Sequence, residues 1–373
     1  MNPQKTGLMY SDDFGCYDAG KGYLVFPAGT VPFMADNNYY ETPERVTQAY
    51  EMLEKTGLLA KLEMIKPRRV DVSELVGFHS QAYIDKLDAL SRTGGGIVGP
   101  MAQIGPHALD VIRQAVGGDL EALDAVMNGR VKNAFCLQRP PAGHAERESG
   151  YGFCIVNTFN ILAQRAIEQY GLKRVLIVDF DNHYKKGIED AWYASGKVLY
   201  VEAHQTGSME ENCGADRSAS MCGEGAGAGF NGFNIPMPTA AGSAAYLRAF
   251  KEVLEPVAEQ FKPELVILVA GFASNVFDPL CRQQLTADGY GKLTEIVRGI
   301  ADCWAQGRLL AVLEGGKGNY MAYCILRVIE AMSGESTSVK DPVQGLLARD
   351  EMRPDDAAAI EAVKSVQRAY WKL

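Results

Sequence analysis

The sequence lacks any apolar run approaching the ~20 residues that a membrane-spanning helix needs. Its first residues, MNPQKTGLMY, contain no apolar h-region of the kind that a secretory signal peptide carries. The eight cysteines include no CxxC pair, a pattern that is typical of free thiols in a reducing compartment rather than of a disulfide framework. We therefore expect a cytoplasmic protein that is not inserted in a membrane.

Positive charge is also in short supply. The formal net charge is −9, so the chain does not offer the basic surface with which proteins bind nucleic-acid phosphates. Apolar residues make up 47% of the chain, which is enough for a sizeable core. Composition thus excludes nucleic acid as an expected partner and favours a globular protein.

Apolar strand segments alternate with amphipathic helical segments over most of the chain. Strands are predicted near residues 132–137, 175–178, 198–203, 265–270 and 309–313, and helices near 42–57, 156–170, 243–260 and 287–305. This alternation predicts an α/β fold with one mostly parallel sheet flanked by helices on both faces. No linker or repeat interrupts it, so residues 1–373 are predicted to form a single domain.

Four other segments carry specific expectations. Residues 7–10 are predicted to form an edge strand, and residues 11–41 a long N-terminal loop. A helix over residues 105–128 is expected to break at Gly117 and Gly118. Residues 205–232 have no apolar period and are predicted to form a Gly-rich loop next to the active site.

The main chemical signal lies in residues 175–186, VLIVDFDNHYKK. The four apolar residues predict a strand buried on both faces. Asp179, Asp181 and His183 follow at period two, so their side chains share one face at the strand's C-terminal end, where open parallel sheets bind ligands. Asp and His beside an open position match a catalytic zinc site. The alternative is a strand end whose polar groups are satisfied within the protein.

Several loops, taken together, resemble those of the histone deacetylase superfamily. The shared motifs are RPP at 139–141, GFC at 152–154, DFDNH at 179–183, AGF…DPL at 270–280, LTADGY at 285–290 and LEGG at 313–316. The chain is most similar to the bacterial class II-like histone deacetylase-like amidohydrolases, with acetylpolyamine amidohydrolases near by. The resemblance implies the arginase/deacetylase-like fold, in which a sheet of about eight strands carries long loops around a tunnel to zinc.

The resemblance also implies roles for individual residues. Asp181 and His183 match two of the family's three zinc ligands. Asp179 matches an aspartate behind them that also belongs to an inner monovalent-cation site, and His144 matches a histidine that handles protons. The walls of the substrate tunnel are matched by Phe153, Leu280, Gly315 and Gly316.

The chain departs from the family at the positions that carry its chemistry. Ala273 replaces the third zinc ligand, Lys317 replaces the tyrosine that polarises the substrate carbonyl, and Gly143 replaces the first histidine of a pair. Because the chain is one residue short after Lys317, Tyr320 is a candidate stand-in for that tyrosine. Further departures are Thr42, Tyr184, Lys185 and Glu202.

These departures predict that the zinc site is degenerate. Catalytic zinc needs three protein ligands, and a charged Lys317 beside the site would repel the ion. We therefore predict an ion pair between Lys317 and Asp181 in place of the metal, and no cofactor. Lys185 or Lys186, beside Glu202, is predicted to take the place of the inner monovalent cation.

Three functions remain open. The first is a metal-independent enzyme that acts on a small acyl or amine compound through Lys317 and His144, since a desolvated lysine can act as a base or nucleophile. The second is a catalytically inactive pseudo-deacetylase that binds an acylated or cationic ligand or a partner. The third is a residual metal-dependent amidohydrolase, in which Asp181 and His183 hold the metal together with Glu210, Glu211, Cys213 or Cys222.

Two expectations concern partners. Members of this branch commonly form homo-oligomers through the long N-terminal loop, and residues 11–41 retain such a loop, so a homo-oligomer is expected. An acidic surface would attract cationic polyamines or acyl-lysine tails toward the tunnel. A small-molecule acyl or amine compound is thus the expected ligand.

Overall fold

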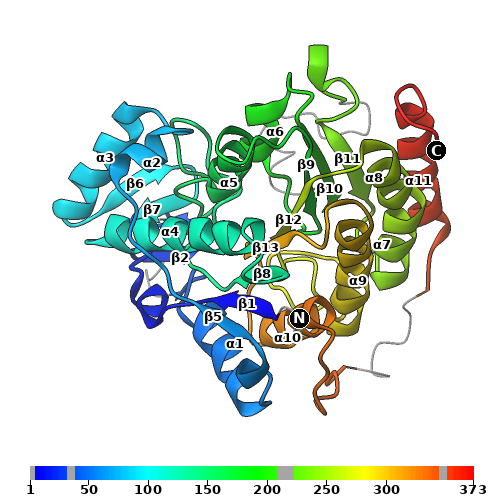
Figure 1. Ribbon diagram of the computed structural model, residues 1–373. Coiled ribbons are helices and arrows are strands. Elements are labelled where there is room, and N and C mark those ends of the chain that lie inside the picture. The colour runs from blue at the N-terminus through cyan, green and yellow to red at the C-terminus, as the bar shows by residue number, and fades with distance from the viewer. Residues whose placement is uncertain (1–4, 32–37, 208–221, 344–350) are drawn as a thin grey trace.

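The protein is built around one eight-stranded parallel sheet (Figure 1). The computed structural model describes residues 5–31, 38–207, 222–343 and 351–373. Across the sheet the strands are β11 (Phe233–Met237), β10 (Val198–Gln205), β9 (Val175–Asp179), β12 (Leu265–Ala270), β13 (Leu309–Leu313), β8 (Asn133–Cys136), β1 (Thr6–Met9) and β5 (Glu63–Ile65). The predicted fold class, a single parallel sheet of about eight strands, is confirmed.

Helices cover both faces of the sheet, as predicted (Figure 1). One face carries α4 (Ala108–Met127), α5 (Thr158–Glu168) and α6 (Lys186–Trp192). The other carries α1 (Glu44–Lys55), α7 (Ser243–Ala249), α8 (Glu255–Phe261), α9 (Ala287–Trp304) and α10 (Met321–Ser333). The short elements beside α4 are α2 (Val72–Val76), α3 (Gln81–Arg92), β6 (Gly96–Gly99) and β7 (Ala102–Ile104), and α11 (Pro354–Gln367) packs on the edge strand β11.

The centre of the sheet sets the position of the site. Every residue of the neighbouring strands β9, β12 and β13 is buried, because helices cover both faces and the strands are apolar runs. The strands are parallel, and their register places Val269 of β12 beside Asp179 of β9. The loops that follow them, which start at residues 180, 271 and 314, therefore leave the same edge of the sheet.

The predicted break in the helix over residues 105–128 is wrong. Helix α4 runs unbroken from residue 108 to 127. A side chain at Gly117 would collide with the carbonyl oxygen of Arg68, and one at Gly118 with the sulfur of Met9. The two glycines thus allow the helix to lie close against its neighbours, and the packing outweighs their low helix propensity.

The predicted edge strand at residues 7–10 is also misplaced, since β1 lies between β8 and β5 inside the sheet. The N-terminal segment is less irregular than expected: it contains a 3-10 turn (Asp12–Cys16) and the small sheet β2 (Gly22–Leu24), β3 (Phe26–Pro27) and β4 (Asn38–Tyr39). Residues 32–37 of that segment, and residues 208–221 of the Gly-rich segment, lie outside the described residues.

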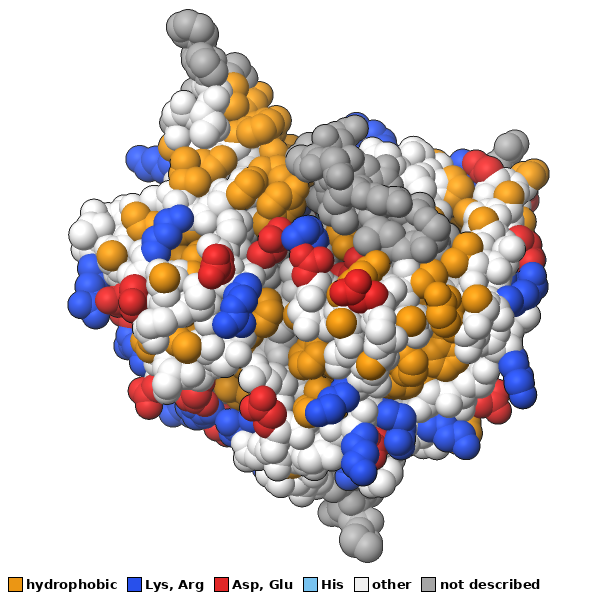
Figure 2. Space-filling view, turned by 90° about the horizontal axis from the view of Figure 1, so that it is seen from above, with side chains coloured by type: hydrophobic (Ala, Val, Ile, Leu, Met, Phe, Trp, Pro, Cys, Tyr) orange, Lys and Arg blue, Asp and Glu red, His pale blue; other side chains and the backbone are white. Residues whose placement is uncertain are grey.

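None of the helices among the described residues combines the length and the apolarity that crossing a membrane requires. Figure 2 shows Lys, Arg, Asp and Glu side chains interspersed over one face, with hydrophobic side chains gathered along a projection at its upper left.

Candidate active site

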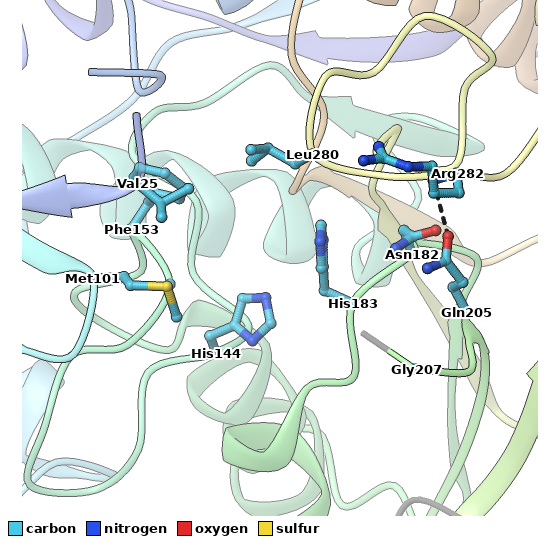
Figure 3. A pocket seen from close by; sticks show the side chains of 11 residues that line it. Val25, Met101, His144, Phe153, Asn182, His183, Gln205, Gly207, Leu280 and Arg282 are labelled. Atoms are coloured by element: carbon cyan, nitrogen blue, oxygen red, sulfur yellow. Dashed lines mark hydrogen bonds between the residues drawn. The ribbon is translucent and has the colours of Figure 1, made fainter. Parts of the chain in front are cut away.

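A cavity opens at the carboxyl edge of the sheet and has two chambers. The outer chamber has a volume of about 250 Å³, and Figure 3 shows His144 and His183 facing each other across it. The inner chamber is much smaller, about 30 Å³. Five residues line both chambers: His144, Gly152, Phe153, His183 and Leu280. The inner chamber is otherwise lined by Pro141, Asp181, Ala273, Asp278, Glu314, Gly315, Gly316 and Lys317.

The predicted site residues therefore come together. Asp181, His183, His144 and Lys317 all line the inner chamber, although they come from segments up to 173 residues apart. The four predicted tunnel residues line it as well. Asp179 and Glu202 lie behind it, completely buried on adjacent strands.

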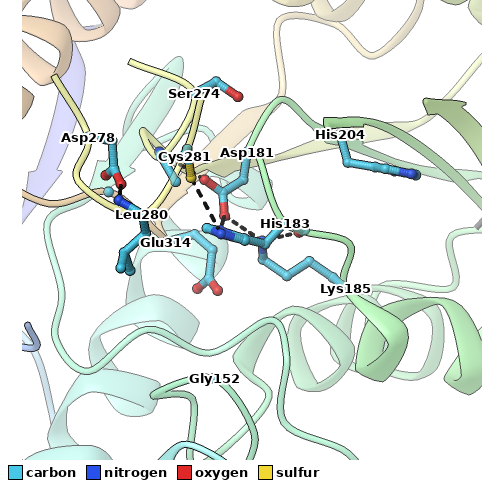
Figure 4. A network of polar contacts seen from close by, with 12 residues as sticks. Gly152, Asp181, His183, Lys185, His204, Ser274, Asp278, Leu280, Cys281 and Glu314 are labelled. Carbon is cyan, nitrogen blue, oxygen red and sulfur yellow. Dashed lines mark hydrogen bonds and ion pairs between the residues drawn. The ribbon is translucent and has the colours of Figure 1, made fainter. Parts of the chain in front are cut away.

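Asp181 forms a buried ion pair with Lys185. The ammonium nitrogen of Lys185 lies 2.5 Å from Asp181 Oδ2 and 2.6 Å from the carbonyl oxygen of His183 (Figure 4). The side chain of Lys185 is 0% exposed and that of Asp181 is 1% exposed. The predicted pair between Asp181 and Lys317 is thus wrong about the lysine, because the ammonium on Asp181 belongs to Lys185.

Gly143 provides the space that Lys185 occupies. A Cβ at Gly143 would lie 3.1 Å from Cδ and 3.3 Å from Cε of Lys185. The lysine methylenes therefore fill volume that a side chain at position 143 would take. Two of the predicted departures from the family pattern, glycine at 143 and lysine at 185, are thus in contact with each other.

Asp181 is held on its other sides by backbone. Its Oδ1 accepts a hydrogen bond of 3.0 Å from the amide of Ala273. A Cβ at Gly315 would lie 2.5 Å from Asp181 Oδ2, so the glycine is needed for the loop after β13 to approach the carboxylate. The imidazole of His183 is farther away, with Nδ1 3.9 Å from Oδ2.

The protonation of the pair follows from its surroundings. Burial alone would raise the pKa of Asp181, but the charges of Lys185 and His183 outweigh it and hold this pKa below its usual range. Burial alone would lower the pKa of Lys185, but Asp181 and Asp179 raise it well above its usual value. The pair is therefore a carboxylate and an ammonium at neutral pH.

A second acidic cluster lies behind this pair, where the sequence predicts a lysine in place of the inner cation. Lys185 contacts this cluster through its backbone amide, which donates to Glu202 at 3.1 Å, while its ammonium group bonds to Asp181. The hydroxyl of Tyr200 donates to Glu202 and lies 3.2 Å from Asp179 Oδ2. Burial raises the pKa of Asp179 well above its usual value. Lys186 instead pairs at the surface with Glu146 and Asp190.

Lys317 has surroundings of the opposite kind. Its ammonium nitrogen lies 4.3 Å from the centroid of the Phe153 ring, and the residue is 5% exposed. Its backbone amide donates to Asp278 Oδ2 at 2.7 Å. Burial lowers the pKa of Lys317 to about 8, and the charge of Arg45 acts in the same direction, while Glu41 and Asp278 oppose it.

His183 also contacts a residue that the sequence interpretation missed. The sulfur of Cys281 lies 3.4 Å from His183 Nε2 (Figure 4). No local sequence signal marks this cysteine, because it is 98 residues away from His183 and reaches it only through the fold. His183 therefore stands between Cys281 and Asp181, with His144 6.3 Å away from ring centroid to ring centroid.

Tyr320 does not replace the missing tyrosine. Its hydroxyl lies 2.9 Å from both carboxylate oxygens of Asp341 and accepts a hydrogen bond from the amide of Ala287. It is not among the residues that line either chamber. Of the candidate rescuing ligands, Cys222 contacts Gln367 of α11 instead, and Glu210, Glu211 and Cys213 lie outside the described residues.

The residues present do not fit a catalytic zinc ion. Asp181 Oδ2 is held by Lys185, and Ala273 offers no side-chain ligand. Within the described ranges no group of three or more His, Cys, Asp and Glu side chains could hold a metal ion. Two side chains without a third are fewer than a catalytic zinc site uses.

Comparison with known proteins establishes the family. The sequence profile described as "Histone deacetylase domain" matches residues 39–332. The chain belongs to the histone deacetylase family. It is 32% identical over 357 residues to the histone deacetylase-like amidohydrolase of Pseudomonas aeruginosa, with 95% of this chain and 92% of that protein covered. It is 31% identical over 376 residues to histone deacetylase 8 of Arabidopsis thaliana, with 99% and 98% covered.

The fold is shared as well. The crystal structure of the HDA15 HD domain superposes with a TM-score of 0.83, at 24% sequence identity, over 98% of this chain and 97% of that one. The predicted membership of the family and the predicted fold are thereby confirmed. Of the positions at which the sequence analysis predicts departures from the family pattern, Ala273 and Lys317 line the inner chamber, and Gly143 and Lys185 lie beside it.

Proposed function

We propose that this protein is a metal-independent enzyme of the histone deacetylase family that acts on a small acyl compound, with the amine of Lys317 as its reactive group and His144 beside it. The observation that carries the proposal is the ammonium of Lys185 on Asp181. It neutralises the carboxylate on which relatives with the full ligand set would hold a metal ion.

Electrostatics argues against a metal at this position. A divalent ion bound about 2 Å from Asp181 would lie within roughly 4.5 Å of the Lys185 ammonium. At an effective dielectric constant of about 20, the repulsion between these charges is roughly 7 kcal/mol. A site with two remaining ligands has little binding energy to offset that cost.

Lys317 is suited to chemistry without a metal. With a pKa of about 8, about one side chain in ten is a neutral amine at pH 7, against about one in 3,000 for an ordinary lysine. A neutral amine can remove a proton or attack a carbonyl carbon. The side chain lies in the chamber that His144 and His183 also line, so proton donors and acceptors are within the same small space.

Metal analysis of the purified protein tests the first half of the proposal. We expect less than stoichiometric zinc by elemental analysis, and turnover that survives dialysis against a chelator. The candidate substrates are a panel of acyl-amines and small acyl carboxylic acids, and mass spectrometry detects their products. Stoichiometric zinc, together with deacylation that a chelator abolishes and zinc restores, would refute the proposal in favour of a residual amidohydrolase.

Variants of Lys317 test the second half. Lys317→Arg keeps the positive charge but cannot form a neutral amine, so we expect kcat to fall at least about 100-fold. Lys61→Met, at an exposed lysine, is the control and should leave kcat unchanged. In the wild type kcat/KM should rise with pH and level off above about pH 8, because the neutral amine is the active form. Equal turnover by Lys317→Arg, or no turnover by the wild type, would contradict this role, and the latter result would favour a binding protein.

A further inference from the structure

The two chambers of the cavity differ in charge. All the carboxylates that line the cavity within the described residues belong to the inner chamber: Asp181, Asp278 and Glu314. The described lining of the outer chamber contains none, and its permanently charged side chain is that of Arg282. A protein with a net charge of −9 thus presents a cation, and no described anion, at the entrance to its site.

Arg282 is positioned by the fold at that entrance. Its backbone amide donates to Gln205 Oε1 at 2.9 Å, which ties it to the end of β10 (Figure 3). Its Nη1 donates to the carbonyl oxygen of Cys281 at 2.9 Å, which leaves other guanidinium N–H groups for a ligand. No carboxylate of the described residues forms an ion pair with it. Arg282 is exposed.

Two amide side chains beside Arg282 complete a polar wall. Gln205 Oε1 accepts from the backbone amide of Arg282, so the NH₂ group of Gln205 is directed toward Asn182 and the cavity (Figure 3). Asn182 is 1% exposed, and its Oδ1 has no hydrogen-bond partner among the described atoms. A buried amide oxygen without a partner costs free energy unless a ligand N–H group or a water donates to it, so Asn182 is the acceptor of this wall, and Arg282 and Gln205 supply its donors.

The opposite wall of the outer chamber is apolar, formed by Val25, Met101, Phe153 and Leu280. A ligand that fits both walls has a hydrocarbon segment between two polar ends. Its outer end meets Arg282 and Gln205, which match a carboxylate in charge and in geometry. Its inner end reaches the chamber that holds Lys317.

We infer that the natural ligand carries a carboxylate at the end that lies in the outer chamber, where Arg282 and Gln205 bind it, and presents its acyl group to the inner chamber. This inference names the substrate class of the proposed function and rests on it for the chemistry. The preference for a carboxylate over an amine is a property of binding and does not require turnover. A cationic polyamine, the ligand that net charge alone would attract, meets like charge at this entrance.

A matched pair of probes tests the inference. N-acetyl-6-aminohexanoate and N-acetylcadaverine have the same acetamide and the same spacer of methylene groups, and they end in a carboxylate and an ammonium. We expect the carboxylate probe to bind the full-length protein at least about tenfold more tightly, measured as dissociation constants by calorimetry at low salt. Equal or tighter binding of the amine probe, or no measurable binding of either probe, would overturn the inference.

Variants of Arg282 make the test specific. Arg282→Gln should remove the preference, and Arg282→Glu should reverse it in favour of N-acetylcadaverine. Arg308→Gln, at the opposite end of the sheet before β13, changes the net charge equally and should keep the wild-type preference. Melting temperatures of all variants establish that they fold. A preference that persists in Arg282→Gln would refute the role of this arginine.

The outcomes also separate this inference from the proposed function. If the protein prefers the carboxylate probe through Arg282 but turns over no compound of the panel, the proposed function fails and the ligand class stands. If Lys317 is required for turnover but Arg282→Gln keeps its affinity for the carboxylate probe, the proposed function stands and the ligand class fails.

Discussion

Lys185 and Lys317 are two buried lysines of one site, and their surroundings are opposite. Lys185 bonds to Asp181 and lies near Asp179, Glu202 and Glu314, which raise its pKa. Lys317 is buried against an aromatic ring, and burial, together with the charge of Arg45, lowers its pKa to about 8. The same side chain is thus a fixed structural cation in one place and a partly neutral amine in the other, because opposite charge outweighs burial only at Lys185.

This difference separates two roles that a single metal ion combines in zinc hydrolases. A metal neutralises the carboxylates around it and also supplies the reactive group. Here Lys185 neutralises Asp181, and it is bonded too firmly to react. No carboxylate of the described residues forms an ion pair with Lys317, which is why we propose its amine, and not that of Lys185, as the reactive group.

The largest effect is expected from Lys185→Met. The variant leaves the buried charge of Asp181 without its ammonium partner, so it should lower the free energy of unfolding by about 3–5 kcal/mol. Urea denaturation measures this loss. Lys186→Met is the control, because Lys186 is 41% exposed and its surface ion pairs should contribute less than about 1 kcal/mol. Equal losses in the two variants would show that Lys185 does not neutralise a buried carboxylate at Asp181.

Lys317→Met should act in the opposite direction. The pKa of Lys317 is lowered in the folded state to about 8, from 10.5, so holding the ammonium in the folded protein costs free energy below pH 8. Removing it should therefore stabilise the protein at pH 7, by up to about 3 kcal/mol.

The sign of the pH dependence checks this assignment. As pH rises from 8 toward 10.5, the folded state binds fewer protons at Lys317 than the unfolded state does, so the wild type gains stability relative to Lys317→Met. The difference between their unfolding free energies should shrink over this range. The assignment would be contradicted if Lys317→Met were less stable than the wild type at pH 7, or if their difference in unfolding free energy were constant with pH. Either result would show that opposite charges stabilise the ammonium of Lys317, as they do that of Lys185.

A smaller effect is expected from Gly143→Ala. The new methyl group would lie 3.1 Å from Cδ of Lys185 and 3.3 Å from Ile188 Cδ1, so the crowding should destabilise the protein by about 1–2 kcal/mol. In a Lys185→Ala background the lysine atoms are gone and most of this cost should disappear. A double-mutant cycle on unfolding free energies measures the coupling, and additive effects would indicate that position 143 does not make room for Lys185.

The smallest effect on the site is expected from Tyr320→Phe. The variant removes the hydroxyl that contacts Asp341 and the amide of Ala287, so it should destabilise the protein by about 1 kcal/mol. Turnover should be unchanged, because Tyr320 lines neither chamber. A loss of kcat without a loss of stability would restore Tyr320 as the stand-in for the family's tyrosine.

Much of the fold could be predicted from periodicity. The predicted strands at residues 265–270 and 309–313 match β12 and β13 residue for residue, because central strands of a parallel sheet are continuous apolar runs. Periodicity does not predict the short strands β5 and β11, and it predicts β1 at an edge, whereas β1 lies inside the sheet. Such strands have few residues and no long apolar run, so their pairing depends on neighbours that are distant in the sequence.

The sequence by itself determined that Asp181, His183, His144 and Lys317 meet at one edge of the sheet, because each follows a strand and parallel strands end at the same side. It did not determine which lysine reaches Asp181. That choice depends on the space at Gly143 and on where two flexible four-carbon side chains can place their ammonium groups. Packing between segments far apart in the chain decides both, and only the tertiary structure contains that information.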